Sequence, residues 1–308
     1  MDDEEWRLSA KADTLKLRAT MIRTIRRFFL DRDFLEIETP LRIPAPAPEL
    51  HIDAVASDDW FLQTSPELCM KRLLAAGYPK IFQICRCFRA GERGARHLPE
   101  FTMLEWYRTQ SDYRVLMDDC EALIACVAVE LGLGVALSRQ GRRIDLRPPW
   151  ERITVREAFA RYAALSVEEA LRRDRFDEIM VSAIEPHLGG EHPVFLYEYP
   201  AALGALARVK PDDPGLAERF ELYIGSLELA NAFSELTDAA EQRRRFEEAA
   251  RDRSRNDCSV YPMPERFLAA LSRMPPSAGI ALGVDRLAMI FAEKSEIDAV
   301  VAFPPELL

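Results

Sequence analysis

The segment that most constrains the fold of this chain is an apolar run that carries three glutamates around one glycine–serine pair. It reads FELYIGSLELANAFSE from Phe220 to Glu235, and the alternation is typical of two strands joined by a turn at Gly225 and Ser226. Carboxylates on a buried strand are costly unless they hold a metal ion or a cationic ligand. The segment therefore predicts an antiparallel hairpin that presents acids to a binding site.

A two-residue turn sets the pairing of this hairpin. Tyr223 then faces Glu228, and Glu221 pairs with Ala230 on the same face as Glu228, one diagonal away. The diagonal is about 7–8 Å between backbones, so the two glutamates could bind one hard cation such as Mg²⁺. An exposed hairpin face with two ordinary acids is an equally good interpretation of the pattern alone.

Composition and charge indicate a globular protein of the cytoplasm. The 308 residues are 48% hydrophobic and 30% charged, the acidic start is unlike a signal peptide, and no apolar run approaches a membrane span. Six cysteines in apolar or regular segments indicate reduced thiols, and only four histidines argue against a zinc site. The net charge of −10 argues against a broad nucleic-acid surface and favours a basic protein partner.

Apolar periodicity over the rest of the chain predicts an α+β fold with a mostly antiparallel sheet flanked by helices. No repeat or linker divides the chain, so residues 1–308 are expected to form a single domain. Strands are expected at 34–40, 80–89, 100–108, 194–199 and 279–282. Helices are expected at 15–32, from Pro66, at 115–133, 154–162, 176–188, 237–255 and 264–273, and after Gly283.

Cationic and aromatic residues cluster around the loop between the strands at 80–89 and 100–108. Arg89 stands at the mouth of this loop, where its planar guanidinium matches phosphate oxygens, and Phe101 could stack on a purine. Taken alone, this segment slightly favours a basic surface turn. The further basic residues of the loop are Arg93, Arg96 and His97.

Arg286 follows Gly283 at a strand-to-helix junction, where the helix N-terminus favours anions. It could hold a second phosphate, although an ion pair with Asp285 explains it equally well. Glu67 could accept an ammonium group, but an acid at a helix start also complements the helix dipole, and that interpretation is favoured on this residue alone. The other candidates for an ammonium site are Tyr107, Asn231 and Glu235.

These motifs occur in one order, and together they resemble the catalytic core of the class II aminoacyl-tRNA synthetases, most of all the lysyl enzymes. The segments at 28–40, 87–102 and 281–287 resemble the three motifs of that class. The first of them begins too early for an anticodon-reading domain to precede it. EFTMLEWY at 100–107 and GIALGVDR at 279–286 are similar to the elongation factor P–(R)-β-lysine ligases, paralogues that aminoacylate a protein lysine.

The resemblance implies a homodimer that uses ATP and Mg²⁺ to activate β-lysine or lysine as an adenylate. The adenylate then passes to a lysine of elongation factor P, without stable tRNA binding and away from membranes. The implied catalytic residues are Arg89, Glu228 and Arg286, and the implied metal ligands are Glu221 and Glu228. The implied ATP-binding residues are Arg89, Ala90, Gly91, His97, Leu98, Phe101, Glu228, Leu229, Gly283 and Arg286. The implied amino-acid-binding residues are Ser65, Pro66, Glu67, Tyr107, Asn231, Phe233, Glu235 and Ala281.

Several positions depart from the family pattern. Ala90 and Gly91 stand where asparagine and glutamate are usual, so ATP is expected to meet their backbone, and Leu98 and Ala232 replace an asparagine and a glycine. Strict alternation would turn Asn231 away from the metal face, so the resemblance requires a bulge near Ala230. Ala281 replaces a glycine of the lysyl enzymes, which fits an amino group on the β carbon. A truncated lysyl-tRNA synthetase and a non-catalytic paralogue are the alternatives.

Overall fold

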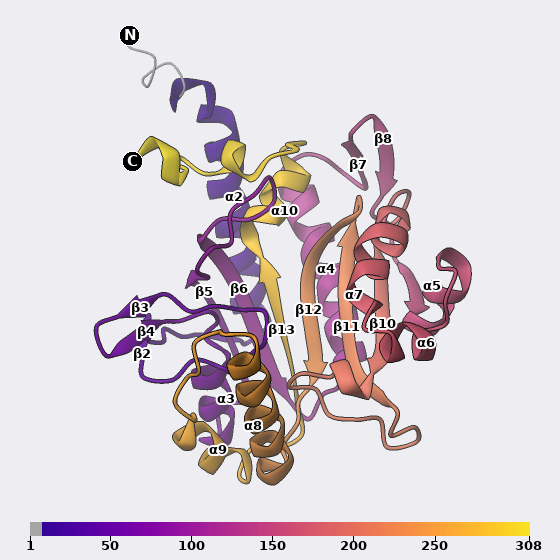
Figure 1. Ribbon diagram of the computed structural model, residues 1–308. Helices are drawn as coiled ribbons and strands as arrows, with labels where there is room; N and C mark the ends of the chain where they lie inside the picture. Colours follow the sequence, from indigo (N-terminus) through magenta and orange to yellow (C-terminus); the bar gives the residue numbers. More distant parts are fainter. Residues whose placement is uncertain (1–7) are drawn as a thin grey trace.

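The computed structural model describes residues 8–308, and its central element is an eight-stranded sheet (Figure 1). The strands follow the order β1–β5–β6–β13–β12–β11–β10–β9, and all neighbours are antiparallel except the outermost pairs β1–β5 and β10–β9. The predicted α+β class with a mostly antiparallel sheet is therefore confirmed. The strands are β1 (Leu35–Glu36), β5 (Lys80–Phe88), β6 (Glu100–Thr109), β9 (Glu151–Thr154), β10 (Val194–Pro200), β11 (Leu216–Ile224), β12 (Leu227–Ser234) and β13 (Ser277–Gly283).

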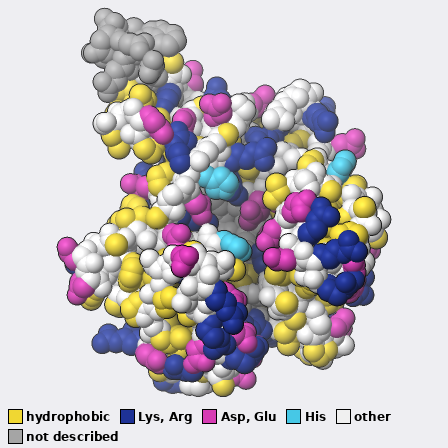
Figure 2. Space-filling model, viewed as in Figure 1, with side chains coloured by type: hydrophobic (Ala, Val, Ile, Leu, Met, Phe, Trp, Pro, Cys, Tyr) yellow, Lys and Arg dark blue, Asp and Glu magenta, His cyan; other side chains and the backbone are white. Residues whose placement is uncertain are grey.

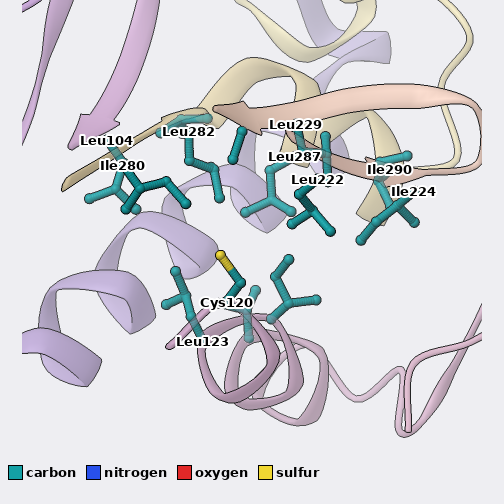
Figure 3. Packing of buried hydrophobic residues seen from close by; sticks show 14 of the residues in the cluster. Leu104, Cys120, Leu123, Leu222, Ile224, Leu229, Ile280, Leu282, Leu287 and Ile290 are labelled. Carbon is teal, nitrogen blue, oxygen red and sulfur yellow. The ribbon is translucent and has the colours of Figure 1, made fainter. Parts of the chain in front are cut away.

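One face of the sheet packs against three helices to form the main core. The helices are α2 (Ala12–Leu30), α4 (Tyr113–Glu130) and α10 (Val284–Phe291). Alternate strand residues point to this face, and Figure 3 shows Leu104, Leu222 and Ile280 of the sheet above Cys120 and Leu123 of α4. Because these side chains are fully buried, the sheet is held rigidly from this side.

The opposite face of the sheet is covered at one end and open at the other. Three helices group together at the covered end in Figure 1: α3 (Glu67–Ala75), α8 (Ala239–Arg255) and α9 (Glu265–Leu271). Their apolar residues, among them Leu74, Phe246 and Phe267, pack with Tyr107 of β6. The remaining part of this face carries the polar side chains of the central strands.

A separate apolar cluster lies beside β9 and β10. It is built from α5 (Val155–Tyr162), α6 (Val167–Arg172) and α7 (Phe176–Ile179). Thr154 and Glu157 form a capping box at the start of α5, with Thr154 Oγ1 accepting from the Glu157 amide at 3.1 Å. The helix predicted at 176–188 is only partly confirmed, because it continues beyond α7 as π and 3₁₀ turns.

The ends of the described chain lie together and hold the loop that follows β5. Lys11 donates to the backbone oxygens of Asp298 and Val301 at 2.8 and 3.0 Å, and Figure 1 shows the C-terminal segment beside α2. Arg93 of the loop forms ion pairs with Asp298 at 2.7 Å and Glu306 at 2.8 Å. These contacts fix a segment that lies over the open face of the sheet.

Short strands account for the main differences from the predictions. The strand predicted at 34–40 has only two residues in β1. The three prolines between positions 44 and 48 indicate a surface loop, whereas residues 46–48 are buried. Six strands escaped prediction because two to four residues are too few to show a period. They are β2 (Arg42–Ile43), β3 (Ala56–Ser57) and β4 (Trp60–Leu62) in one small sheet, β7 (Ala136–Arg139) and β8 (Arg142–Asp145) in another, and β9 at the edge of the main sheet.

All six cysteines are free thiols, as predicted. None of the helices within residues 8–308 combines the length and the apolar character that a membrane crossing needs. The acidic start of the chain lies outside the described residues.

Candidate active site

The acidic hairpin forms as β11 and β12, and it contains the required bulge. Tyr223 pairs with Glu228 as predicted, but the next pair is Leu222 with Ala230, so Leu229 is an extra residue in β12. Leu229 and Ala230 consequently both point into the main core. The bulge lies one residue before the position inferred from the sequence.

This bulge decides which side chains share the open face. Beyond it, Glu221 pairs with Asn231 and not with Ala230, which corrects the register predicted from the two-residue turn. Glu221, Glu228 and Asn231 therefore face the same side of the sheet, because directly opposed residues of paired strands point the same way. Phe233 follows on this side by alternation.

The open face forms a cleft with a cavity volume of about 290 Å³. It lies in the hollow at the centre of the view in Figure 2. Most of the predicted site residues line this cleft: Ser65, Glu67, Arg89, His97, Leu98, Phe101, Tyr107, Glu228, Leu229, Asn231, Phe233, Ala281, Gly283 and Arg286. The predicted residues that do not line it are Pro66, Ala90, Gly91, Glu221 and Glu235.

Arg286 organises one end of the cleft. Its guanidinium donates to the backbone oxygen of Glu228 at 2.9 Å and lies 3.3 Å from the Glu228 carboxylate. A second guanidinium nitrogen lies 2.6 Å from His97 Nε2, which accepts. Burial and then the charge of Arg286 lower the pKa of His97, so this ring is neutral at physiological pH. An anion placed here would meet a guanidinium that is already oriented.

Arg89 lies at the same end, with its guanidinium 5.1 Å from the centre of the Phe101 ring and 3.7 Å from the Glu92 carboxylate. The next residues turn away from the cleft, since the Ala90 amide donates to the Asp53 oxygen at 2.7 Å and Gly91 adopts a φ of 75°. Glu92 itself lines the cleft. A carboxylate is therefore present in the cleft one residue after the position where the family pattern has its glutamate.

Glu221 and Glu228 are the two carboxylates predicted from the sequence to bind a divalent cation. Glu221 accepts hydrogen bonds from Arg219 at 2.6 Å and from the Tyr223 hydroxyl at 2.7 Å. The pKa of Glu228 is raised by burial and then by the charge of Glu221. No cluster of three or more acidic, histidine or cysteine ligands is found within residues 8–308. Two glutamates fit Mg²⁺, which commonly takes one or two carboxylates and completes its shell with phosphate oxygens and water.

The other end of the cleft centres on Glu105, which the sequence reasoning missed. Glu105 is fully buried and accepts hydrogen bonds from the Ser65 hydroxyl at 2.6 Å and from the Tyr107 hydroxyl at 2.8 Å. Burial, followed by the nearby charge of Glu67, raises the pKa of Glu105 to about 8. Its place two residues before Tyr107 on a strand was a usable signal, because such residues share a face.

Lys71 was also missed, and it joins two of the predicted acids. Its ammonium lies 2.5 Å from both the Glu67 and the Glu235 carboxylates. Glu235 has no exposed side-chain surface, and burial raises its pKa to about 8 despite Lys71. Its Oε1 atom has no hydrogen-bond partner among the described residues. A Cβ atom built on Gly279, which lines the cleft, would lie 2.4 Å from that oxygen, so Oε1 occupies the space that a side chain at position 279 would need.

The cleft thus has two chemically different ends. Arg89 and Arg286 suit an anion at one end. Three glutamates and one lysine lie at the other, where a cationic ligand would favour ionisation of the acids whose pKa is raised by burial. The acids of that second end are Glu67, Glu105 and Glu235.

Comparison of the sequence with known proteins identifies the family of this chain. The family described as tRNA synthetases class II (D, K and N) matches residues 5–306, so the chain belongs to that family. Its relatives include an elongation factor P–(R)-β-lysine ligase of Edwardsiella ictaluri, 42% identical over 98% of each chain. The ligase of Erwinia tasmaniensis is 41% identical over the same shares. Within the class II family, the chain belongs to the elongation factor P–(R)-β-lysine ligases.

A lysine–tRNA ligase is also similar, but over a smaller part of its own length. The enzyme of Moorella thermoacetica is 39% identical over 93% of this chain and 64% of that protein.

Proposed function

We propose that this protein is an ATP-dependent ligase that activates (R)-β-lysine as an adenylate and transfers it to a lysine side chain of elongation factor P. The observation that carries this proposal is the single cleft that joins an arginine end to a carboxylate end. β-Lysine has one carboxylate and two amino groups, so it matches that polarity along its length. The names of the full-length relatives supply the acceptor protein.

At the arginine end, Arg89 holds the substrate carboxylate and the α-phosphate of ATP, and Arg286 holds the terminal phosphate. The substrate carboxylate attacks the α-phosphorus, and pyrophosphate leaves with the electron pair of the broken P–O bond. Neutral His97 keeps Arg286 in place by accepting its hydrogen bond. Mg²⁺ held by Glu221 and Glu228 would neutralise phosphate charge.

The nucleotide itself is proposed to lie along the same end. Phe101 stacks on adenine, and its ring already faces a guanidinium. Leu98, Leu229 and Gly283 line this part of the cleft and provide apolar surface and close backbone approach. Ala90 and Gly91 contribute by shaping the turn that carries Glu92 into the cleft.

At the carboxylate end, the amino groups of β-lysine pair with buried acids. Glu67 and Glu105 hold one ammonium, and the free oxygen of Glu235 accepts the other. Asn231 and Tyr107 add directional hydrogen bonds. The remaining proposed contacts are Phe233 along the alkyl chain, Ala281 beside the β carbon, and the Ser65–Pro66 turn that positions Glu67.

We further propose that one domain spans residues 1–308 and that it works as a homodimer in the cytoplasm, without stable tRNA binding. Leu30, Leu35 and Leu41, near the edge strand β1, are 53%, 49% and 44% exposed and would be covered in a dimer. Light scattering on the purified protein should give twice the chain mass. Free thiols suit a reducing compartment, and a net charge of −10 disfavours tRNA.

The deciding experiment measures both half-reactions. Pyrophosphate exchange should depend on (R)-β-lysine more strongly than on lysine, and the intact mass of elongation factor P should then rise by one β-lysyl group. Charging of tRNA should stay at background. Exchange with lysine alone, together with labelled tRNA and unmodified elongation factor P, would overturn the proposal.

A further inference from the structure

A second and wider groove adjoins the cleft. Its cavity volume is about 1050 Å³, and it runs between α8 on one side and the segment around α7 with the ends of β10 and β11 on the other. It continues the hollow seen in Figure 2. Four residues line both spaces, namely Glu49, Ile52, Leu206 and Glu228. A molecule in the groove therefore has direct access to the cleft.

The groove is acidic in balance. Eight acids line it against three arginines, and all three arginines are already paired: Arg219 with Glu221, and Arg244 and Arg245 with Glu241. An excess of negative charge in a concave surface attracts a cationic group such as a lysine ammonium on another protein. The eight acids are Glu49, Asp177, Glu185, Glu221, Glu228, Glu241, Glu248 and Asp252.

Glu49 lies at the junction of the two spaces on a firmly held backbone. The fully buried Arg253 donates to the backbone oxygens of Glu49 at 2.7 Å and Ile52 at 3.0 Å, and it also pairs with Asp53. The Glu49 side chain is half-buried. Within residues 8–308, no side-chain hydrogen bond or ion pair involves its carboxylate.

The charges around Glu49 come from three elements. Glu67 and Lys71 face it from α3, Arg89 faces it from the end of β5, and Arg219 faces it from β11. Burial and then Glu67 raise the pKa of Glu49, while the three cations lower it. Glu49 thus lines the same cleft as Arg89, which holds the reacting carboxylate in the proposed function.

Four other acids around the junction of the two spaces already have partners. Glu228 is paired with Arg286, Glu221 with Arg219, and Glu67 and Glu235 with Lys71. Among the acids that line both spaces, Glu49 is the one whose carboxylate has none of these contacts. A proton acceptor must have a free oxygen within reach of the reacting amine, which makes Glu49 the acid best placed for that task.

We propose that the acceptor lysine of elongation factor P enters through this groove and that Glu49 accepts the proton its amine loses during transfer. The inference rests on the proposed function. The acceptor ammonium first loses a proton to water in the open groove. The neutral amine attacks the adenylate carbonyl, the C–N bond forms, and AMP leaves with the electrons of the C–O bond. The remaining ammonium proton passes to the Glu49 carboxylate, leaving the amide.

The substitution Glu49→Gln tests this step because glutamine keeps the shape of the side chain but cannot accept the proton as a carboxylate does. Exchange of pyrophosphate with (R)-β-lysine should stay within about threefold of wild type, which also shows that the variant folds. Single-turnover transfer from the adenylate to saturating elongation factor P should fall about 100-fold. Hydroxylamine, a nucleophile that is neutral without a base, should capture the adenylate at the wild-type rate.

Two further variants separate proton transfer from docking. Glu49→Asp keeps a carboxylate and should restore part of the transfer rate. Glu185→Gln removes an equally half-buried acid that lines the groove but not the cleft, so it should weaken capture of elongation factor P but not the rate at saturation. Deprotonation of the acceptor lysine should make the transfer rate rise with pH in both proteins. Wild type should show a further ionisation, that of Glu49, which Glu49→Gln should lack.

Three outcomes would overturn the inference. Loss of exchange in Glu49→Gln would place this acid in the amino-acid pocket. A weaker affinity for elongation factor P with an unchanged rate at saturation would make Glu49 a docking residue only. A transfer rate within about threefold of wild type would exclude any role in the step. If the wild-type protein itself shows no pyrophosphate exchange or no transfer to elongation factor P, the proposed function is wrong and the inference that rests on it fails too.

Discussion

Substitution of Glu105 by glutamine should change how the stability of this protein depends on pH. Glu105 is fully buried, and its pKa is raised from 4.5 to about 8, chiefly by burial. At 1.36 kcal/mol per pKa unit, a shift of that size corresponds to about 5 kcal/mol. The two hydrogen bonds from Ser65 and Tyr107 favour the carboxylate but do not outweigh the loss of hydration.

The sign follows from which state holds the proton. Between pH 4.5 and about 8 the unfolded chain has an ionised Glu105 and the folded protein has a neutral one. Unfolding then releases a proton, so this residue lowers the free energy of unfolding by about 1.4 kcal/mol for each pH unit gained. Its stabilising contribution is complete below 4.5 and lost as the pH approaches about 8.

Urea unfolding of wild type and Glu105→Gln at several pH values would measure this effect. From about pH 5.5 to about pH 7.5 the variant should gain about 3 kcal/mol relative to wild type, because glutamine does not titrate. Glu100→Gln is a matched control, since Glu100 is an exposed acid at the start of the same strand and should show no such trend. A constant difference between Glu105→Gln and wild type would show that Glu105 is ionised in the folded protein.

Three other substitutions test the site and its support. Gly279→Ala should reduce activation of β-lysine by at least about 10-fold, because its Cβ atom would lie 2.1 Å from the Tyr107 ring. Gly190→Ala is the matched control: its Cβ atom would have no atom nearer than 3.9 Å, so activation should stay at the wild-type rate. Glu228→Gln should lower Mg²⁺-dependent pyrophosphate exchange by at least about 100-fold, and an unchanged Mg²⁺ titration would contradict the metal assignment. Arg18→Met should cost about 3–5 kcal/mol in chemical unfolding by leaving Asp285 buried without its ion pair, and an unchanged free energy of unfolding would contradict this role.

Local patterns were sufficient to predict much of this fold. The capping box at Thr154, the helix start after Ser65 and the glycine–serine turn of the hairpin all form where their residues indicate. Each depends on groups within a few residues of one another, so the sequence carries the whole signal. The resemblance to the class II family likewise assigned Phe233 and Tyr107 to the site, and both line the cleft.

The sequence predicted less of the charge balance inside the site. Lys71 was read as part of a helix, but it lies between Glu67 and Glu235, a contact across more than half of the chain. Glu105 was not singled out, because its raised pKa comes from burial and from the charge of Glu67, and neither can be inferred from the local sequence. Ion pairs between distant elements depend on how those elements pack.

The sequence by itself therefore determined the α+β class, the acidic hairpin and the family, because these depend on short-range spacing and residue type. Only the tertiary structure decided that the extra residue of β12 is Leu229, that Glu221 faces Asn231, and that Glu49 joins two cavities. A bulge can be accommodated at more than one residue, and its place is chosen by which side chains the core can bury. Here Leu229 and Ala230 both enter the core, which leaves Glu228 and Asn231 on the face of the cleft.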